Sequence, residues 1–173
     1  MALVQDVFNT IAEQFVERAT DIAAFVKTGY SFEEWLNWEA FAACQRHADW
    51  VVHPKPQYKK LGVANTRELA DLLVEHDALQ VAVEIGLAHG WTNMGKWAEK
   101  LNWDSKKLER LQDNIAPLQL MVFTTQTDLV KSDYWPKHLA RVKRWGQPTE
   151  LTSVSCLPPA GQLHIRGWTR HTG

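Results

Sequence analysis

The segment Leu69-Ala-Asp-Leu-Leu-Val-Glu-His-Asp-Ala-Leu-Gln-Val-Ala-Val-Glu-Ile-Gly-Leu87 contains two apolar runs separated by the polar tripeptide His76-Asp77-Ala78. Two apolar runs around a turn-forming tripeptide predict a β-hairpin. Side chains alternate between the two faces of a strand. One face of the second strand is therefore uniformly apolar and holds Val81, Val83, Ile85 and Leu87. The opposite face carries a carboxylate among small residues, namely Ala82, Glu84, Gly86 and Ala88.

Acidic residues interrupt both apolar runs of this hairpin. Glu84 lies in the middle of the second run, and Asp71 lies in the first run between Ala70 and Leu72. A carboxylate inside an apolar strand is costly unless another group compensates its charge. A divalent cation is the usual compensation where two carboxylates converge, because hard cations take oxygen ligands. We therefore expect Asp71 and Glu84 to share a Mg²⁺ or Mn²⁺ site.

The order of these acids resembles that of the PD-(D/E)xK nuclease superfamily. Members have a helix with a Glu, a strand ending near an Asp, a strand with Glu-x-Lys, and then a helix and another strand. Here Ala70-Asp71-Leu72 is similar to the Asp strand, Val83-Glu84-Ile85-Gly86 is similar to the Glu-x-Lys strand, and Glu39 resembles the helical Glu. The resemblance spans residues 32 to 125. It implies an α/β (α+β) restriction-endonuclease-like fold, with a mixed central β-sheet flanked by helices and an extra N-terminal helix.

The same resemblance implies a metal centre beside a scissile phosphate. Its ligands would be the carboxylates of Asp71, Glu84 and Glu39 and the carbonyl of Ile85. Glu39 also has a purely structural interpretation. It lies on the apolar stripe of a helix predicted to begin at a capping box, Ser31-Phe-Glu-Glu34, and to end near residue 47. There it would pair with an arginine such as Arg46.

One position departs from the family pattern, because Gly86 stands where the family has its lysine. A glycine leaves room at this point of the strand. In some nucleases of the superfamily another element supplies the lysine, and the helix that follows the Glu strand carries Lys96 and Lys100 one turn apart. His89 is a further substitute. The alternative is that these residues are ordinary surface lysines and a turn histidine.

Composition indicates a soluble globular protein of one domain. The chain has 173 residues, and 45% of them are hydrophobic while 23% are charged. We divide it into an N-terminal helix (1–29), a nuclease-like core (30–125) and a basic C-terminal part (126–173). Two cysteines without metal spacing, a start without a secretory signal and the lack of a membrane-length apolar run predict a cytoplasmic protein with no membrane partner.

Charge is distributed unevenly along the chain. Residues 1–133 hold 13 Lys and Arg against 19 Asp and Glu, whereas residues 134–173 hold six basic residues against Glu150 alone. This basic end favours a polyanionic partner, most simply DNA, although a solvated helix face is the alternative. The candidate phosphate contacts are Lys59, Lys60, Lys137, Arg141, Lys143 and Arg144.

The rest of the pattern completes a mixed sheet with helices around it. It predicts a helix over 3–27, a strand over 50–53 continuing through 58–60, a helix over 93–111, a strand over 117–123, a helix over 133–145, and strands over 151–157 and 163–168.

Three functional hypotheses follow. The first is a Mg²⁺- or Mn²⁺-dependent nuclease that uses Asp71, Glu84 and a relocated lysine, Lys96 or Lys100. The second is a catalytically inactive nuclease fold that binds nucleic acid or protein, with nine tryptophans and the N-terminal helix forming a homodimer or a partner contact. The third is a structural or assembly protein whose strand acids are coincidental.

Overall fold

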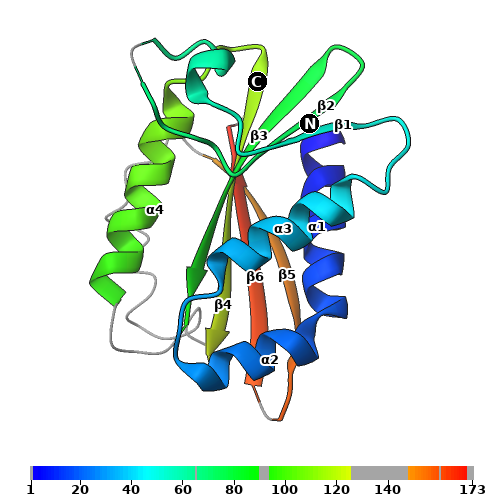
Figure 1. Cartoon of the computed structure of the whole chain (residues 1–173), viewed down its shortest axis with the longest axis vertical. Coiled ribbons are helices and arrows are strands. Elements are labelled where there is room, and N and C mark those ends of the chain that lie inside the picture. The colour runs from blue at the N-terminus through cyan, green and yellow to red at the C-terminus, as the bar shows by residue number, and fades with distance from the viewer. Residues whose placement is uncertain (1, 65, 90–93, 126–147, 160, 171–173) are drawn as a thin grey trace.

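Three helices precede the sheet in the computed structural model, which describes residues 2–64, 66–89, 94–125, 148–159 and 161–170. They are α1 (Ala2–Glu17), α2 (Ala19–Thr28) and α3 (Glu33–Cys44), as Figure 1 shows. The single helix expected over 3–27 is thus two helices. The chain bends at Arg18, and α2 ends at Gly29, whose left-handed backbone (φ 73°) lets its amide bond to the Val26 carbonyl.

Six described strands form one mixed sheet in the order β1-β2-β3-β4-β6-β5. Neighbouring strands are antiparallel except β3 and β4, which are parallel and are joined through the helix α4. Parallel neighbours need such a crossover because a tight turn cannot connect them. The expected mixed sheet flanked by helices is confirmed. The bounds are β1 Val51–Pro54, β2 Leu72–His76, β3 Leu79–Ala88, α4 Met94–Glu109, β4 Ile115–Thr125, β5 Thr149–Leu157 and β6 Gly161–Thr169.

The hairpin predicted from residues 69–87 is formed by β2 and β3. Leu72 pairs with Val83 and His76 with Leu79, so the turn falls at Asp77 and Ala78. Asp77 has a positive φ of 53°, a conformation that Asp tolerates better than most residues.

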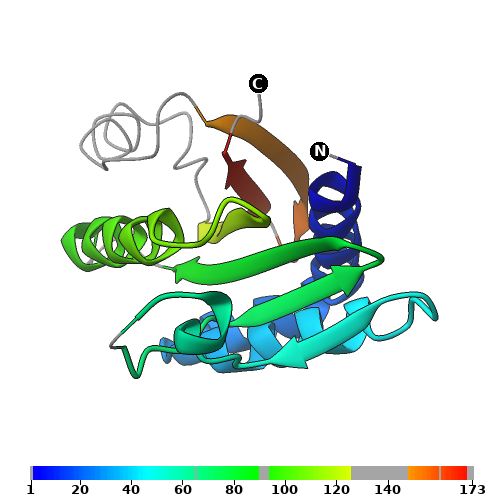
Figure 2. The same cartoon turned by 90° about the horizontal axis from the view of Figure 1, so that it is seen from above.

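The two faces of β3 lie in different environments, as the alternation predicts. The apolar face packs against α1, α2 and α3 in the main core, whereas Ala82 and Ala88 belong to two smaller cores on the side of α4. Figure 2 shows α4 on one side of the twisted sheet and α1 and α3 around the other. Glu84 therefore points toward α4.

Local expectations fail at two places. Residues Tyr58–Leu61 form a 3₁₀ helix, η1, rather than a continuation of β1. The predicted capping box is also wrong, because α3 has Phe32 at its N-cap and no side-chain capping bond. The helix expected over 133–145 lies outside the described residues.

Helix α1 packs directly on Gly167 of β6. A Cβ built there would lie 2.7 Å from Cδ2 of Phe8, a buried residue of α1. We expect Gly167→Ala to lower the free energy of unfolding by about 1–3 kcal/mol, the usual cost of overpacking a core. Denaturant unfolding measures this.

The matched control is Gly95→Ala in α4, where an added Cβ meets nothing within 4 Å. Alanine favours helix over glycine, so this change should raise stability by up to about 1 kcal/mol. Equal effects of the two substitutions would contradict the packing described between α1 and β6.

Candidate active site

Asp71 is fixed by contacts from four directions immediately before β2. Its amide donates to the Val83 carbonyl (3.1 Å), and its Oδ2 accepts the Ile85 amide (2.7 Å). Its Oδ1 accepts both Asn37 Nδ2 (3.0 Å) and Lys55 Nζ (2.8 Å). The carboxylate is thus held against β3. The Ile85 backbone reaches it through the amide, and the metal-binding role of the Ile85 carbonyl stays a prediction.

Glu84 is buried, with 1% of its surface exposed. Its Oε1 accepts the Tyr58 hydroxyl (2.6 Å), and its Oε2 lies 2.8 Å from Lys107 Nζ of α4. Burial raises the pKa of Glu84 to about 8, and the carboxylates of Asp104 and Asp71 add to the shift while Lys107 opposes it. The compensation that the sequence required is therefore provided within the protein by a phenol and an ammonium.

Lys100 of α4 also reaches this region. Its Nζ lies 3.1 Å from Asp104 Oδ2 and 3.4 Å from Glu33 Oε1. Burial alone would lower the pKa of Lys100, but the carboxylates of Asp104, Glu33 and Asp71 raise it, so the side chain stays an ammonium at neutral pH. Lys96, one turn earlier, is exposed. Of the two candidate lysines, the structure thus brings Lys100 to the acids.

The helical acid near Asp71 is Glu33 rather than Glu39. Glu33 Oε2 accepts the Leu87 amide of β3 (3.3 Å), and the negative charge of Asp71 contributes to its raised pKa, after the larger effect of burial. Glu39 instead accepts Gln14 Nε2 (2.5 Å) and Arg18 Nε (3.1 Å). The structural interpretation of Glu39 thus describes its contacts, with Arg18 in place of Arg46.

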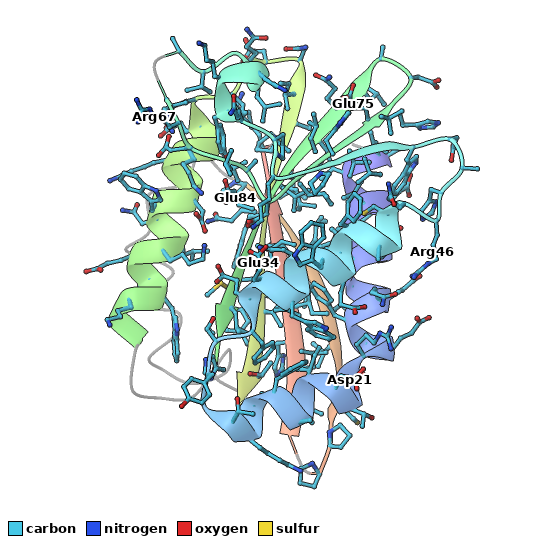
Figure 3. The ribbon with its side chains drawn as sticks, viewed as in Figure 1. Asp21, Glu34, Arg46, Arg67, Glu75 and Glu84 are labelled. Carbon is cyan, nitrogen blue, oxygen red and sulfur yellow. The ribbon has the colours of Figure 1, made fainter. Side chains whose placement is uncertain are left out.

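Sequence reasoning missed Glu33 because it assigned residues 31–34 to a capping box. The pair of adjacent acids, Glu33 and Glu34, at the start of a helix was the available signal. Glu34 lies at the exposed end of the site, 3.1 Å from Lys55 Nζ. Figure 3 shows Glu84 near the centre of the molecule, in the region between α4 and α3, and Glu34 on α3.

We call these five acids the carboxylate cluster: Glu33, Glu34, Asp71, Glu84 and Asp104. Three lysines contact it: Lys55, Lys100 and Lys107. With every group ionised, five negative charges face three positive ones, which leaves two negative charges uncompensated. Burial is the main cause of the raised pKa values of Glu33 and Glu84, and neighbouring carboxylates of the cluster add to it. One divalent cation would balance the two uncompensated negative charges.

The carboxylates of the cluster are oxygen donors, the ligand type that a hard divalent cation takes. Among the described residues, no three His, Cys, Asp or Glu side chains are grouped as a metal site. Mg²⁺, however, is commonly bound by one or two carboxylates together with waters and substrate phosphate oxygens. The cluster supplies such carboxylates, and the buried amide oxygen of Asn37, next to Asp71, has no hydrogen-bond partner among the described residues.

The space expected beside Gly86 is filled. A Cβ at this position would lie 2.6 Å from Sδ of Met121, a buried residue of β4. The strand position that resembles the family's lysine is therefore part of the apolar packing under α4, and a lysine side chain cannot extend from it without displacing Met121.

The predicted phosphate contacts are only partly described. Lys59 and Lys60 lie exposed on η1, whereas Lys137, Arg141, Lys143 and Arg144 lie outside the described residues. His89 packs its ring near Phe32, 5.8 Å between centroids, and burial lowers its pKa.

No protein-family model, curated protein or solved structure matches the chain. None of the described helices combines the length and the apolar character that a bilayer span requires. The site is therefore interpreted from its own geometry.

The raised pKa of Glu84 predicts how stability depends on pH. Below the ordinary pKa of 4.5, Glu84 is protonated in both the folded and the unfolded chain. Between pH 4.5 and about 8, the unfolded chain releases this proton while the folded chain retains it, so stability falls. We expect the free energy of unfolding of Glu84→Gln to rise relative to that of wild type by on the order of a few kcal/mol between pH 5 and pH 8.

Urea unfolding at a series of pH values measures this difference. Glu109→Gln, at the exposed end of α4, is the control and should follow wild type. If the free energies of unfolding of wild type and Glu84→Gln change equally with pH, the raised pKa of Glu84 is contradicted.

Proposed function

We propose that the chain is a metal-dependent nuclease of the PD-(D/E)xK type that hydrolyses phosphodiester bonds, most simply in DNA. Asp71, Glu84 and Glu33 are its acids, and Lys100 is its relocated lysine. The observation that carries the proposal is the convergence of these residues. The two acids singled out by sequence and a lysine from α4 belong to one network of charges, although they come from β2, β3 and α4.

The order of elements supports a restriction-endonuclease-like core. Helix α3 is followed by the antiparallel strands β1, β2 and β3, and then by α4 and the parallel strand β4. This is the succession of helix, strands, helix and strand that the resemblance implies. Asp71 lies immediately before β2, and Glu84 lies within β3.

The chain's own residues have distinct chemical roles in this proposal. A bound Mg²⁺ or Mn²⁺ would supply an activated water and stabilise negative charge on the phosphorus centre. Lys100, held by Asp104 and Glu33 and partly exposed, places an ammonium where it can stabilise a developing oxyanion. Asn37 and the Ile85 amide orient the carboxylate of Asp71.

Substrate binding is proposed for the basic residues outside the cluster. Lys59 and Lys60 lie on η1, and Lys137, Arg141, Lys143 and Arg144 complete the set that we expect to contact phosphates.

The free thiols Cys44 and Cys156 are compatible with a reducing, cytoplasmic setting.

A catalytically inactive binding module is the second candidate. It is favoured by Met121, which occupies the space beside Gly86, and by Trp38 and Trp103, which are 50% and 58% exposed. These tryptophans are the described candidates for a partner contact. The N-terminal helix is not an open apolar face, because Val7 and Phe8 are buried in the main core.

Cleavage assays with matched lysine variants test the proposal. Wild-type protein should cut DNA in Mg²⁺ or Mn²⁺. Asp71→Asn and Lys100→Met should reduce the rate by about 100-fold or more, because each removes a group that stabilises the reacting centre. Lys96→Met removes the same charge one turn away on the exposed side of α4, and should leave the rate within about twofold of wild type.

Thermal unfolding of each variant separates loss of activity from loss of fold. Absence of cleavage of single- and double-stranded DNA and RNA by folded wild-type protein would exclude the nuclease proposal and favour the binding module. Equal loss in Lys96→Met and Lys100→Met would exclude the assigned role of Lys100.

A further inference from the structure

Lys55 is attached to Asp71 at two points. Its backbone amide donates to the Asp71 carbonyl (3.1 Å), and its Nζ donates to Asp71 Oδ1 (2.8 Å). The same Nζ lies 3.1 Å from Oε2 of Glu34. The lysine therefore places its charge directly on the carboxylate that the proposed nuclease needs for its metal.

The backbone of Lys55 is unfavourable for this residue type. It has a positive φ of 50° and lies between Pro54 and Pro56. Non-glycine residues seldom adopt positive φ, and such strain persists only where surrounding contacts fix it. Proline on both sides restricts the neighbouring backbone further. The Lys55 amide bond to Asp71, the pairing of Pro54 with Leu72 and the bond from the Ala70 amide to the Pro56 carbonyl (2.9 Å) fix this segment beside β2.

The other two lysines of the cluster are bound differently. Lys100 and Lys107 share Asp104 as a partner on their own helix, four and three residues away. They keep this partner whatever happens at Asp71. Lys55 has no such local carboxylate: its partners are Asp71 itself and Glu34, whose side chain is 65% exposed. Lys55 is thus the ammonium that can leave Asp71 without breaking a pair inside a helix.

Lys55 lies on a solvent-accessible side of the cluster. The Lys55 side chain is 30% exposed, whereas Glu84 is 1% exposed and covered by Tyr58 and Lys107. A cation arriving from solvent therefore meets Lys55 before it meets Glu84. Glu34 offers Lys55 a second carboxylate nearer to solvent.

We propose that Lys55 is a built-in competitor for the metal: its ammonium occupies Asp71 in the metal-free protein and is exchanged for the incoming divalent cation. Lys55 then moves toward Glu34, and it sets the metal concentration at which the site fills. The inference rests on the proposed function, because it takes Asp71 as a metal ligand.

The test is direct titration of Mn²⁺ by isothermal calorimetry, on the full-length protein without substrate. Lys55→Met keeps the length and apolar stem of the side chain and removes its charge. We expect it to bind Mn²⁺ about tenfold more tightly than wild type, which corresponds to the loss of one competing ion pair of about 1.4 kcal/mol. Lys27→Met, an equal change of charge at the exposed end of α2, should leave the affinity within about twofold.

A double variant assigns the gain to Asp71. Lys55→Met with Asp71→Asn should lose the tighter binding. Circular dichroism on the same samples verifies that each variant is folded, and Lys55→Gln provides a second neutral replacement if Lys55→Met does not fold.

The outcomes separate this inference from the proposed function. Equal or weaker Mn²⁺ binding by the Lys55 variants overturns the competitor role while the metal site stands. No Mn²⁺ binding by wild type or by either Lys55 variant overturns both. If the Lys55 variants bind Mn²⁺ more tightly but the protein cleaves no nucleic acid, the competitor role is supported and only the proposed nuclease activity is excluded.

Discussion

The buried carboxylate of Glu84 is the constraint on which the rest of the site depends. A charge on the inner face of β3 needs partners that reach it through an otherwise apolar layer. Tyr58 and Lys107 provide them from opposite elements, η1 and α4. Both α4 and η1 therefore contact the same side chain of β3. Burial nevertheless raises the pKa of Glu84 to about 8, with Asp104 and Asp71 adding to the shift, so Lys107 offsets only part of the cost of a charge at this position.

The helix α4 supplies two of the three lysines that contact the carboxylate cluster. Lys100, Asp104 and Lys107 are spaced by four and three residues, so they follow one side of the helix toward the sheet. Leu101 and Leu108 are buried on the same helix. Apolar packing therefore fixes the helix while its charged stripe meets Glu33 and Glu84. The cluster is buried where Lys107 meets Glu84 and more exposed where Lys55 meets Glu34.

The parts of the fold that depend on the alternation of side chains between the two faces of a strand were predicted from the sequence. The β2–β3 hairpin, the two faces of β3 and the later strands followed from periodicity, because one buried face strongly constrains register. The break between α1 and α2 at Arg18 and the 3₁₀ helix at Tyr58 depend on tertiary packing. No local sequence pattern predicted them. Among site residues, Asp71, Glu84 and Lys100 were predicted to act together, and the structure brings them into one network. Glu33, Lys55, Asp104 and Lys107 were missed, because their roles arise from contacts between elements distant in sequence.

The contact between Gly86 and Met121 couples two positions on neighbouring strands. A residue larger than glycine at 86 meets the sulfur of Met121, so the two sites cannot vary independently. A side chain at 86 is accommodated only if Met121 shifts or is replaced by a smaller residue, which is epistasis in its simplest steric form. Relatives of this chain with a larger residue at 86 should accordingly have a smaller or repositioned side chain at 121.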